Sequence, residues 1–165
     1  MKIIVLLSII SLLLAASSAG ALDAVEAPTS CKQCNMDRTA YAQSRMLIVH
    51  ADGSTVGVCS LHCAAAELQQ NRDKPVRTLM VADYSTKELL DAKTANWVVG
   101  GKKKGVMTAL AKWAFAREDD ARRFVEEQGG TVNSFEQAMK SATMEVMEQA
   151  AEERAVEREI LREQK

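Results

Sequence analysis

The chain has 165 residues, with 21 Lys and Arg against 22 Asp and Glu and a formal net charge of −1. Domains that bind nucleic acid usually carry a basic face, so this near balance argues against nucleic acid as a partner. A chain of this length buries roughly 68% of its unfolded surface, so the four cysteines are not needed as cross-links and invite a chemical explanation.

The first 21 residues have the three parts of a secretory signal peptide: Lys2, an apolar run, and an Ala19-Gly20-Ala21 end. The apolar core is shorter than the roughly 20 residues that cross a bilayer, so we expect cleavage after Ala21 rather than a retained anchor. Removal of Lys2 leaves 20 basic against 22 acidic residues, a charge of −2. The pattern predicts an exported, soluble, periplasmic protein with no stable membrane span in the mature chain.

A polar linker at residues 22–30 precedes the first predicted module. Asp52-Gly53 joins two β-rich segments in RMLIVHADGSTVGVC, which is typical of a hairpin. Ser60 suits the N-cap of a helix over LHCAAAELQQN, which must end before Pro75. The first module is therefore predicted to consist of a cysteine knuckle, a hairpin and a helix.

The middle of the chain repeats this order less clearly. We expect a strand at 76–84, a short helical turn at 85–91, and strands at 94–101 and 106–116 joined by GGKKKG. Acidic residues favour a helix start at 118, and Gly129-Gly130 favours its end.

The order of two strands followed by a helix thus occurs twice, at about residues 41–72 and 94–128. We predict an α+β fold made of two degenerate ββα modules, at about 31–75 and 76–133. A treble-clef-like cysteine knuckle begins this domain, and a long C-terminal helix follows it.

Ser134 suits the cap of that long helix, residues 134–165, after a short TVN strand. Apolar residues in its first half recur at the spacing of one helix face, whereas from about residue 152 the charges alternate and the helix should project into solvent. We expect the methionines on this helix to fill the core rather than to pass on a metal: Met139, Met144 and Met147.

The four cysteines form two close pairs, Cys31-x2-Cys34 and Cys59-x3-Cys63, separated by the predicted hairpin. The second pair lies on the first turn of a predicted helix. This spacing is typical of a treble-clef or zinc-knuckle site, where a turn and a helix start bring four thiolates to one metal. Helix N-termini also lower the pKa of a thiol. The four sulfurs should therefore lie close together.

The spacing of the cysteines is compatible with three kinds of site. Exported proteins usually pair four cysteines as disulfides, although a Cys31–Cys34 bridge closes a tiny loop and would stabilise little. The 2+2 spacing also fits a closed, structural zinc site. A soft metal is favoured by Met36, because thioethers select copper(I). His62 is a further donor candidate, whereas His50 at the hairpin end should face solvent.

Four segments in order resemble the NosL family, the accessory proteins of nitrous oxide reductase. CKQCNM corresponds to the family's Cys-x-x-Cys-Gly-Met, and VMTALAKWAFA to its Met-containing strand. LMVADYSTKELLDAKTANWVVGG and EDDARRFVEEQGGTVNSFEQAM correspond to its Val-x-Asp-Tyr and Gly-Gly segments. The resemblance covers a NosL-like domain at about 31–140.

The resemblance implies a copper(I)-binding metallochaperone that delivers copper to a periplasmic enzyme, nitrous oxide reductase in denitrification, alongside an ABC-type maturation complex. It also implies two related ββα modules, as in the organomercurial lyase MerB. The metal ligands that it implies are Cys34 and Met36, with Met107 as the third donor. Asn35 and Val106-Met107-Thr108 depart from the family's Gly and Pro-Met-Gly.

The remaining donor candidates are then either extra metal ligands or a scaffold that holds Cys34 and Met36 in place: Cys31, Cys59, Cys63 and His62. The alternative function is a structural zinc or disulfide treble-clef module in heavy-metal trafficking or protein interaction. We do not expect an enzyme, because lyase chemistry needs an acid beside the thiolates and nothing in the sequence places Asp37 or Asp83 there.

Overall fold

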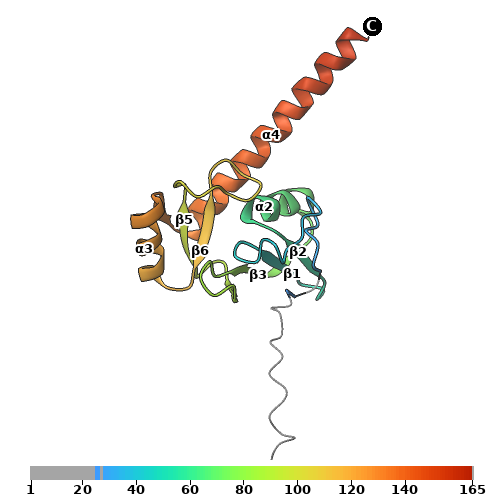
Figure 1. Cartoon of the computed structure of the whole chain (residues 1–165). Helices are drawn as coiled ribbons and strands as arrows, with labels where there is room; N and C mark the ends of the chain where they lie inside the picture. Colours follow the sequence, from blue (N-terminus) through green and yellow to red (C-terminus); the bar gives the residue numbers. More distant parts are fainter. Residues whose placement is uncertain (1–24, 27, 165) are drawn as a thin grey trace, which may run out of the picture.

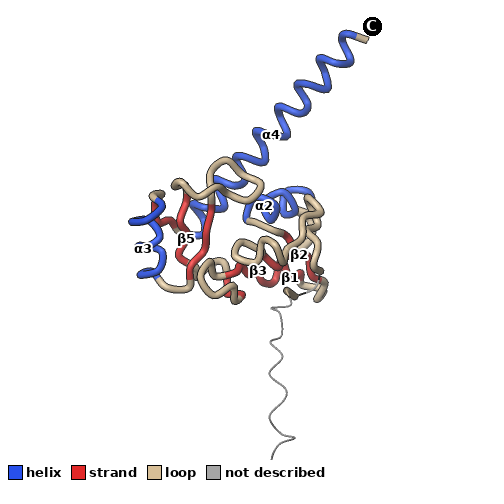
Figure 2. The backbone as a smooth tube through the Cα atoms, viewed as in Figure 1, coloured by secondary structure: helices blue, strands red, loops and turns tan. Residues whose placement is uncertain are grey.

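Two antiparallel sheets and three helices make up the computed structural model, which describes residues 25, 26 and 28–164 (Figure 1; Figure 2). The first sheet has the order β2-β1-β3-β4 and the second β6-β5-β7. The strands are β1 (Met46–His50), β2 (Thr55–Val58), β3 (Val76–Ala82), β4 (Leu89–Asp91), β5 (Asn96–Val99), β6 (Lys112–Phe115) and β7 (Thr131–Asn133). The helices are α2 (Leu61–Gln70), α3 (Glu118–Gln128) and α4 (Phe135–Glu163).

This architecture confirms the predicted α+β fold with two degenerate ββα modules. The expected signal peptide, residues 1–21, lies outside the described residues. Among the described helices, none combines the length and the apolar composition that a membrane crossing requires.

The first module follows the sequence pattern closely. Asp52 Oδ1 accepts the backbone N–H of Ser54 (2.9 Å), and Gly53 has φ +86°, a conformation that glycine adopts without steric cost. The side chain of Ser60 caps α2 by accepting the N–H of Cys63 (3.4 Å). The predicted hairpin and helix start are both confirmed.

The helical turn predicted at 85–91 is wrong, because this segment holds β4. The Asp83 carboxylate accepts the N–H of Thr86 (2.8 Å), and Lys87 takes a left-handed φ of +65°. The chain thereby turns back along the free edge of β3, where its backbone groups find ladder partners. The first sheet consequently extends to Asp91, beyond the module boundary that we expected near residue 75.

The strand predicted at 106–116 is too long. Only β6 is strand, and residues 106–111 form an irregular loop in which Met107 has φ +59°. The strand predicted at 94–101 is present as β5. Helix α3 ends as expected, with the N–H of Gly129 donating to the Val125 carbonyl oxygen (2.8 Å).

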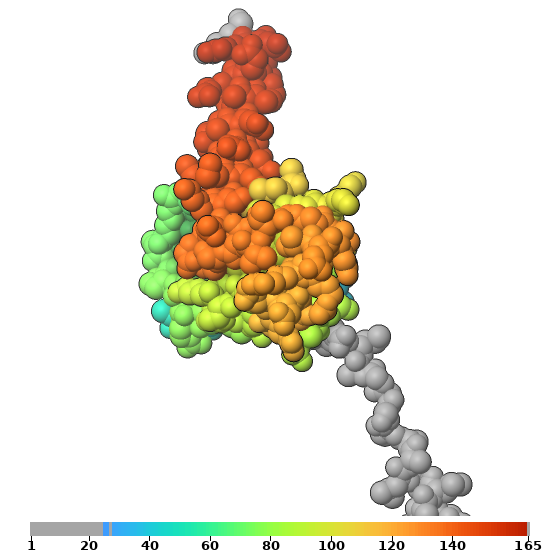
Figure 3. Space-filling view, turned by 90° about the vertical axis from the view of Figure 1, so that its left-hand side faces the viewer, coloured from blue at the N-terminus to red at the C-terminus, as the bar shows by residue number. Residues whose placement is uncertain are grey.

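Helix α4 joins the two modules. Ser134 and Gln137 form a capping box at its start, and its first half packs against α2 and β5, with Ala138 and Ala142 fully buried. Such small side chains let two helices approach closely. Beyond this contact the helix stands clear of the body, and Val156 is 60% exposed (Figure 3).

Two methionines of α4 do not fill the core as expected. Met144 and Met147 are 52% and 57% exposed. Met139 does pack against the core. His50 also differs from its prediction: it is only 1% exposed and points inward from the end of β1.

Part of the expected linker packs on the first module through a buried arginine. The guanidinium of Arg38 is fully buried and pairs with the Glu26 carboxylate, which also accepts from Arg45 Nε (2.9 Å). Arg38 further donates to the carbonyl oxygens of Met46 (2.9 Å) and Val58 (3.2 Å). The residues just before the cysteine knuckle are thereby tied to β1 and β2.

Replacement of Arg38 by Met should lower the free energy of unfolding by about 3 kcal/mol, because Glu26 and two carbonyl oxygens lose a buried partner. Urea unfolding measures this. The matched control is Arg122→Met on α3, whose ion pair with Glu118 is exposed and should contribute little. Equal effects of the two substitutions would contradict the role assigned to Arg38.

Candidate metal centre

A tight turn presents Cys31 and Cys34. The N–H of Cys31 donates to the Met36 carbonyl oxygen, and the N–H of Asn35 donates to the Cys31 carbonyl oxygen, both at 2.9 Å. Asn35 has φ +60°, a left-handed backbone that asparagine adopts more readily than most other residues except glycine. The N–H of Lys32 donates to the Gly57 carbonyl oxygen (2.9 Å), which fixes the turn against β2.

The second cysteine pair comes from the junction of β2 and α2. Cys59 follows the last residue of β2, and its carbonyl oxygen accepts the Ser44 hydroxyl (2.8 Å). Cys63 lies in the first turn of α2, directly after the Ser60 cap. The hairpin and the helix start thus bring this pair to the turn that carries Cys31 and Cys34.

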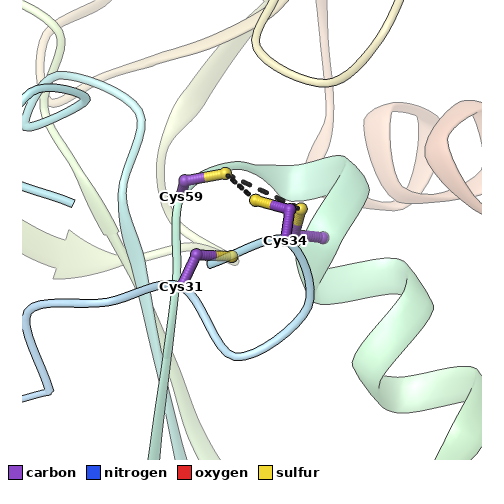
Figure 4. A group of neighbouring side chains, drawn as sticks. Cys31, Cys34 and Cys59 are labelled. Carbon is purple, nitrogen blue, oxygen red and sulfur yellow. Dashed lines mark hydrogen bonds between the residues drawn. The ribbon is translucent and has the colours of Figure 1, made fainter. Parts of the chain in front are cut away.

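All four sulfurs lie within 4.8 Å of one another. Cys34 Sγ is 3.5 Å from Cys59 Sγ and 3.9 Å from Cys63 Sγ, and Cys59 Sγ is 3.6 Å from Cys63 Sγ. The three labelled side chains of Figure 4 point toward one another. Thiolates bound at about 2.3 Å around a tetrahedral metal are about 3.8 Å apart, whereas a disulfide bond is about 2.05 Å long. These separations fit metal coordination by free thiols rather than disulfides.

The four thiols differ in access to solvent. Cys31, Cys59 and Cys63 are at most 1% exposed, while Cys34 is only partly buried. A metal ion held here would be enclosed on three sides by protein. Of the four cysteines, Cys34 is therefore the most accessible to an incoming ligand.

Hydrogen bonds among the thiols lower the pKa of one cysteine and raise the pKa values of two others. The thiol of Cys59, followed by that of Cys63, donates to the Cys31 sulfur, which together with the N–H groups of Cys34 and Gln33 lowers the pKa of Cys31 well below its usual range. Donation to Cys31 raises the pKa of Cys59 to about 12. Contacts with Cys31 and Cys59, and burial, also raise the pKa of Cys63. A cation that binds all four sulfurs must displace the protons held on Cys59 and Cys63.

The other predicted ligands are not all brought to the cysteines. Met36 is half-buried and packs against the core that contains the cysteines, but the left-handed Asn35 means that it does not share an extended strand with Cys34. Met107 lies in the second module, on the loop before β6, and is 43% exposed. His62 does not belong to the four-sulfur group.

The imidazole of His62 faces α4 instead. Its Nδ1 is buried without a hydrogen-bond partner and lies 3.9 Å from Glu145 Oε2. Burial lowers the pKa of His62, so the ring is neutral near pH 7.

A polar network at the junction of the modules was not predicted. Lys112 on β6 and Glu145 on α4 form an ion pair of 2.6 Å, and the lysine side chain is 1% exposed. The sequence did contain one indication, because Lys112 interrupts the apolar run ALAKWAFA. An ionisable residue in such a run needs a buried partner.

Fold and site together define an α+β protein of two ββα modules with a cysteine metal centre. The NosL family model matches residues 22–143, so the chain belongs to the NosL family. Among solved structures, the fold is similar to the crystal structure of the copper chaperone NosL from Shewanella denitrificans, with 20% identity and a TM-score of 0.55. That match covers 68% of this chain and 91% of the other. A search of curated proteins gives no significant match.

A cation that binds all four sulfurs should bind more tightly as the pH rises from about 6 to 8, because such binding displaces the protons of Cys59 and Cys63. Competition against a chelator of known affinity measures this, with calorimetry in buffers of different ionisation enthalpy to count protons. Coordination by all four sulfurs releases ~2 protons or more per ion. Release of fewer than ~1 proton, with no pH dependence, would exclude Cys59 and Cys63 as ligands.

Proposed function

We propose that this protein is an exported metallochaperone that binds copper(I) as cargo and delivers it to a periplasmic copper enzyme. The observation that carries the proposal is the group of four converging cysteine sulfurs, of which only Cys34 is partly exposed, in a chain of the NosL family. The structurally similar NosL is named a copper chaperone, which supports the same cargo here. Soft thiolate and thioether donors select copper(I) over harder cations.

Within this proposal, Cys34 and Met36 are the first two ligands. They lie on one tight turn with Cys34 facing outward, so a partner's sulfur or nitrogen can attack the ion from the open side. Met107, from the loop of the second module, is the third donor. Copper then moves by ligand exchange, without catalysis, because a new bond forms at the open position before the bond to Cys34 breaks.

Cys31, Cys59 and Cys63 play a supporting part in this proposal. All three are buried, and Cys59 Sγ lies 3.6 Å from Cys63 Sγ and 3.5 Å from Cys34 Sγ, which packs the turn of Cys34 against β2 and α2. The proposed recipient is nitrous oxide reductase, with an ABC-type maturation complex as a further partner. Both follow from membership of the family rather than from any contact in this chain.

Purified protein under reducing, anaerobic conditions should take up about one copper(I) per chain. Cys34→Ser and Met36→Ala should each weaken binding at least about tenfold, or ~1.4 kcal/mol, because each removes a soft ligand. Competition with a chromogenic copper(I) chelator measures the affinity. Met144→Ala is the matched control, since that methionine is exposed on α4. Unchanged affinity in both site variants would show that the ligands are wrongly assigned.

A second candidate function is a closed zinc module in heavy-metal trafficking or protein interaction. Its support is the sulfur spacing of 3.5–3.9 Å, close to the edge of a tetrahedral four-thiolate site. Cys63→Ser separates the two candidates, because it opens a zinc cage but leaves Cys34 and Met36 in place. Protein isolated with one zinc per chain that resists chelators, and lost in the Cys63 variant, would favour this module over the copper chaperone.

A further inference from the structure

The second module holds a buried ammonium group beside the Met107 loop. Lys112 Nζ donates to Glu145 Oε1 (2.6 Å), to the Leu110 carbonyl oxygen (2.8 Å) and to Thr108 Oγ1 (3.4 Å). These three acceptors use all three of its N–H bonds. Lysine is rarely buried unless it is fully paired. The loop between Thr108 and Lys112 is therefore folded around this charge.

Glu145 connects that loop to the first module. Its carboxylate accepts the hydroxyl of Thr108, and its Oε2 lies 3.9 Å from Nδ1 of His62. His62 is the neighbour of Cys63 in the first turn of α2. One side chain of α4 thus contacts both the residue next to Met107 and the residue next to a cysteine of the metal centre.

The backbone of Met107 needs such an anchor. Its φ of +59° is unfavourable for a residue other than glycine and persists only where the surroundings fix it. In the segment before the loop, Lys103 Nζ lies 5.6 Å from the ring centroid of Tyr84, between β3 and β4, and 5.9 Å from that of Trp113 on β6. Contact with α4, which packs against α2, relates the Thr108 end to the first module.

We propose that Glu145 is a positioning residue for copper binding, which acts through Thr108 to fix the loop that carries Met107. The inference rests on the proposed function, in which Met107 is the third copper donor. It adds that α4, which also packs against α2 of the first module, anchors the Met107 loop. Residues that support a metal ligand without touching the metal typically change affinity by about 10- to 100-fold.

The test is a double-mutant cycle on the purified protein with copper(I) affinity as the readout. Thr108→Val and Glu145→Gln should each weaken binding about 10- to 100-fold, while Thr108→Ser, which keeps the hydroxyl, should restore it. In a Met107→Ala background, both substitutions should change affinity by about twofold or less, because the ligand that they position is gone. Glu148→Gln, one turn further along the same helix and exposed, is the control.

The outcomes separate the inference from the proposed function. Loss of affinity in Met107→Ala with no effect of Thr108→Val or Glu145→Gln would overturn the positioning role alone. Equal losses from Thr108→Val with and without Met107 would also overturn it, because the effect would then be on the fold. No effect of Met107→Ala would instead refute the third donor of the proposed function, and the positioning role with it. Thr108→Val keeps the Lys112–Glu145 pair, so it remains informative if Glu145→Gln fails to fold.

Discussion

Four cysteine sulfurs within 4.8 Å of one another cannot all carry a negative charge unless a cation lies between them. Without one, Cys31 takes the charge, and Cys59 and Cys63 keep their protons and donate to it. The rest of the first module serves this convergence: the left-handed Asn35 closes the turn, and the hairpin and the Ser60 cap bring in the second pair. Because the four sulfurs lie so close together, a soft cation could bind them by displacing their protons.

The second constraint lies between the modules. Helix α4 contacts both, and its Glu145 neutralises the buried Lys112 of the second module beside His62 of the first. Removal of one partner would leave a charge buried alone, which is strongly destabilising. Thr108 anchors the loop of residues 106–111 to this ion pair. In the proposed function, Met107 on this loop and the partly exposed Cys34 would hold the copper ion from one side.

Local patterns in the sequence predicted local structure well. Asp52-Gly53, Ser60, Ser134 and Gly129 marked turns, caps and ends that the structure confirms, because each acts through neighbouring backbone groups. The predictions that were wrong depend on contacts between segments that are far apart in the sequence. β4 pairs with the free edge of β3, and the loop of residues 106–111 supplies acceptors to the buried Lys112. No short window of the sequence shows either contact. The spacing of the cysteines was enough to predict their convergence, but the role of Glu145 depends on how α4 crosses both modules.

X-ray absorption at the copper edge of the copper(I)-loaded protein tests the central claim most directly, because it counts the sulfur atoms around the ion. An open site made by Cys34, Met36 and Met107 predicts low-coordinate copper(I) with three sulfur donors, and a loss of one sulfur in the Met107→Ala variant. Four sulfur donors that persist in that variant, or a nitrogen donor in the coordination shell, would contradict it. Either result would assign the metal to the four-cysteine cage or to His62 instead.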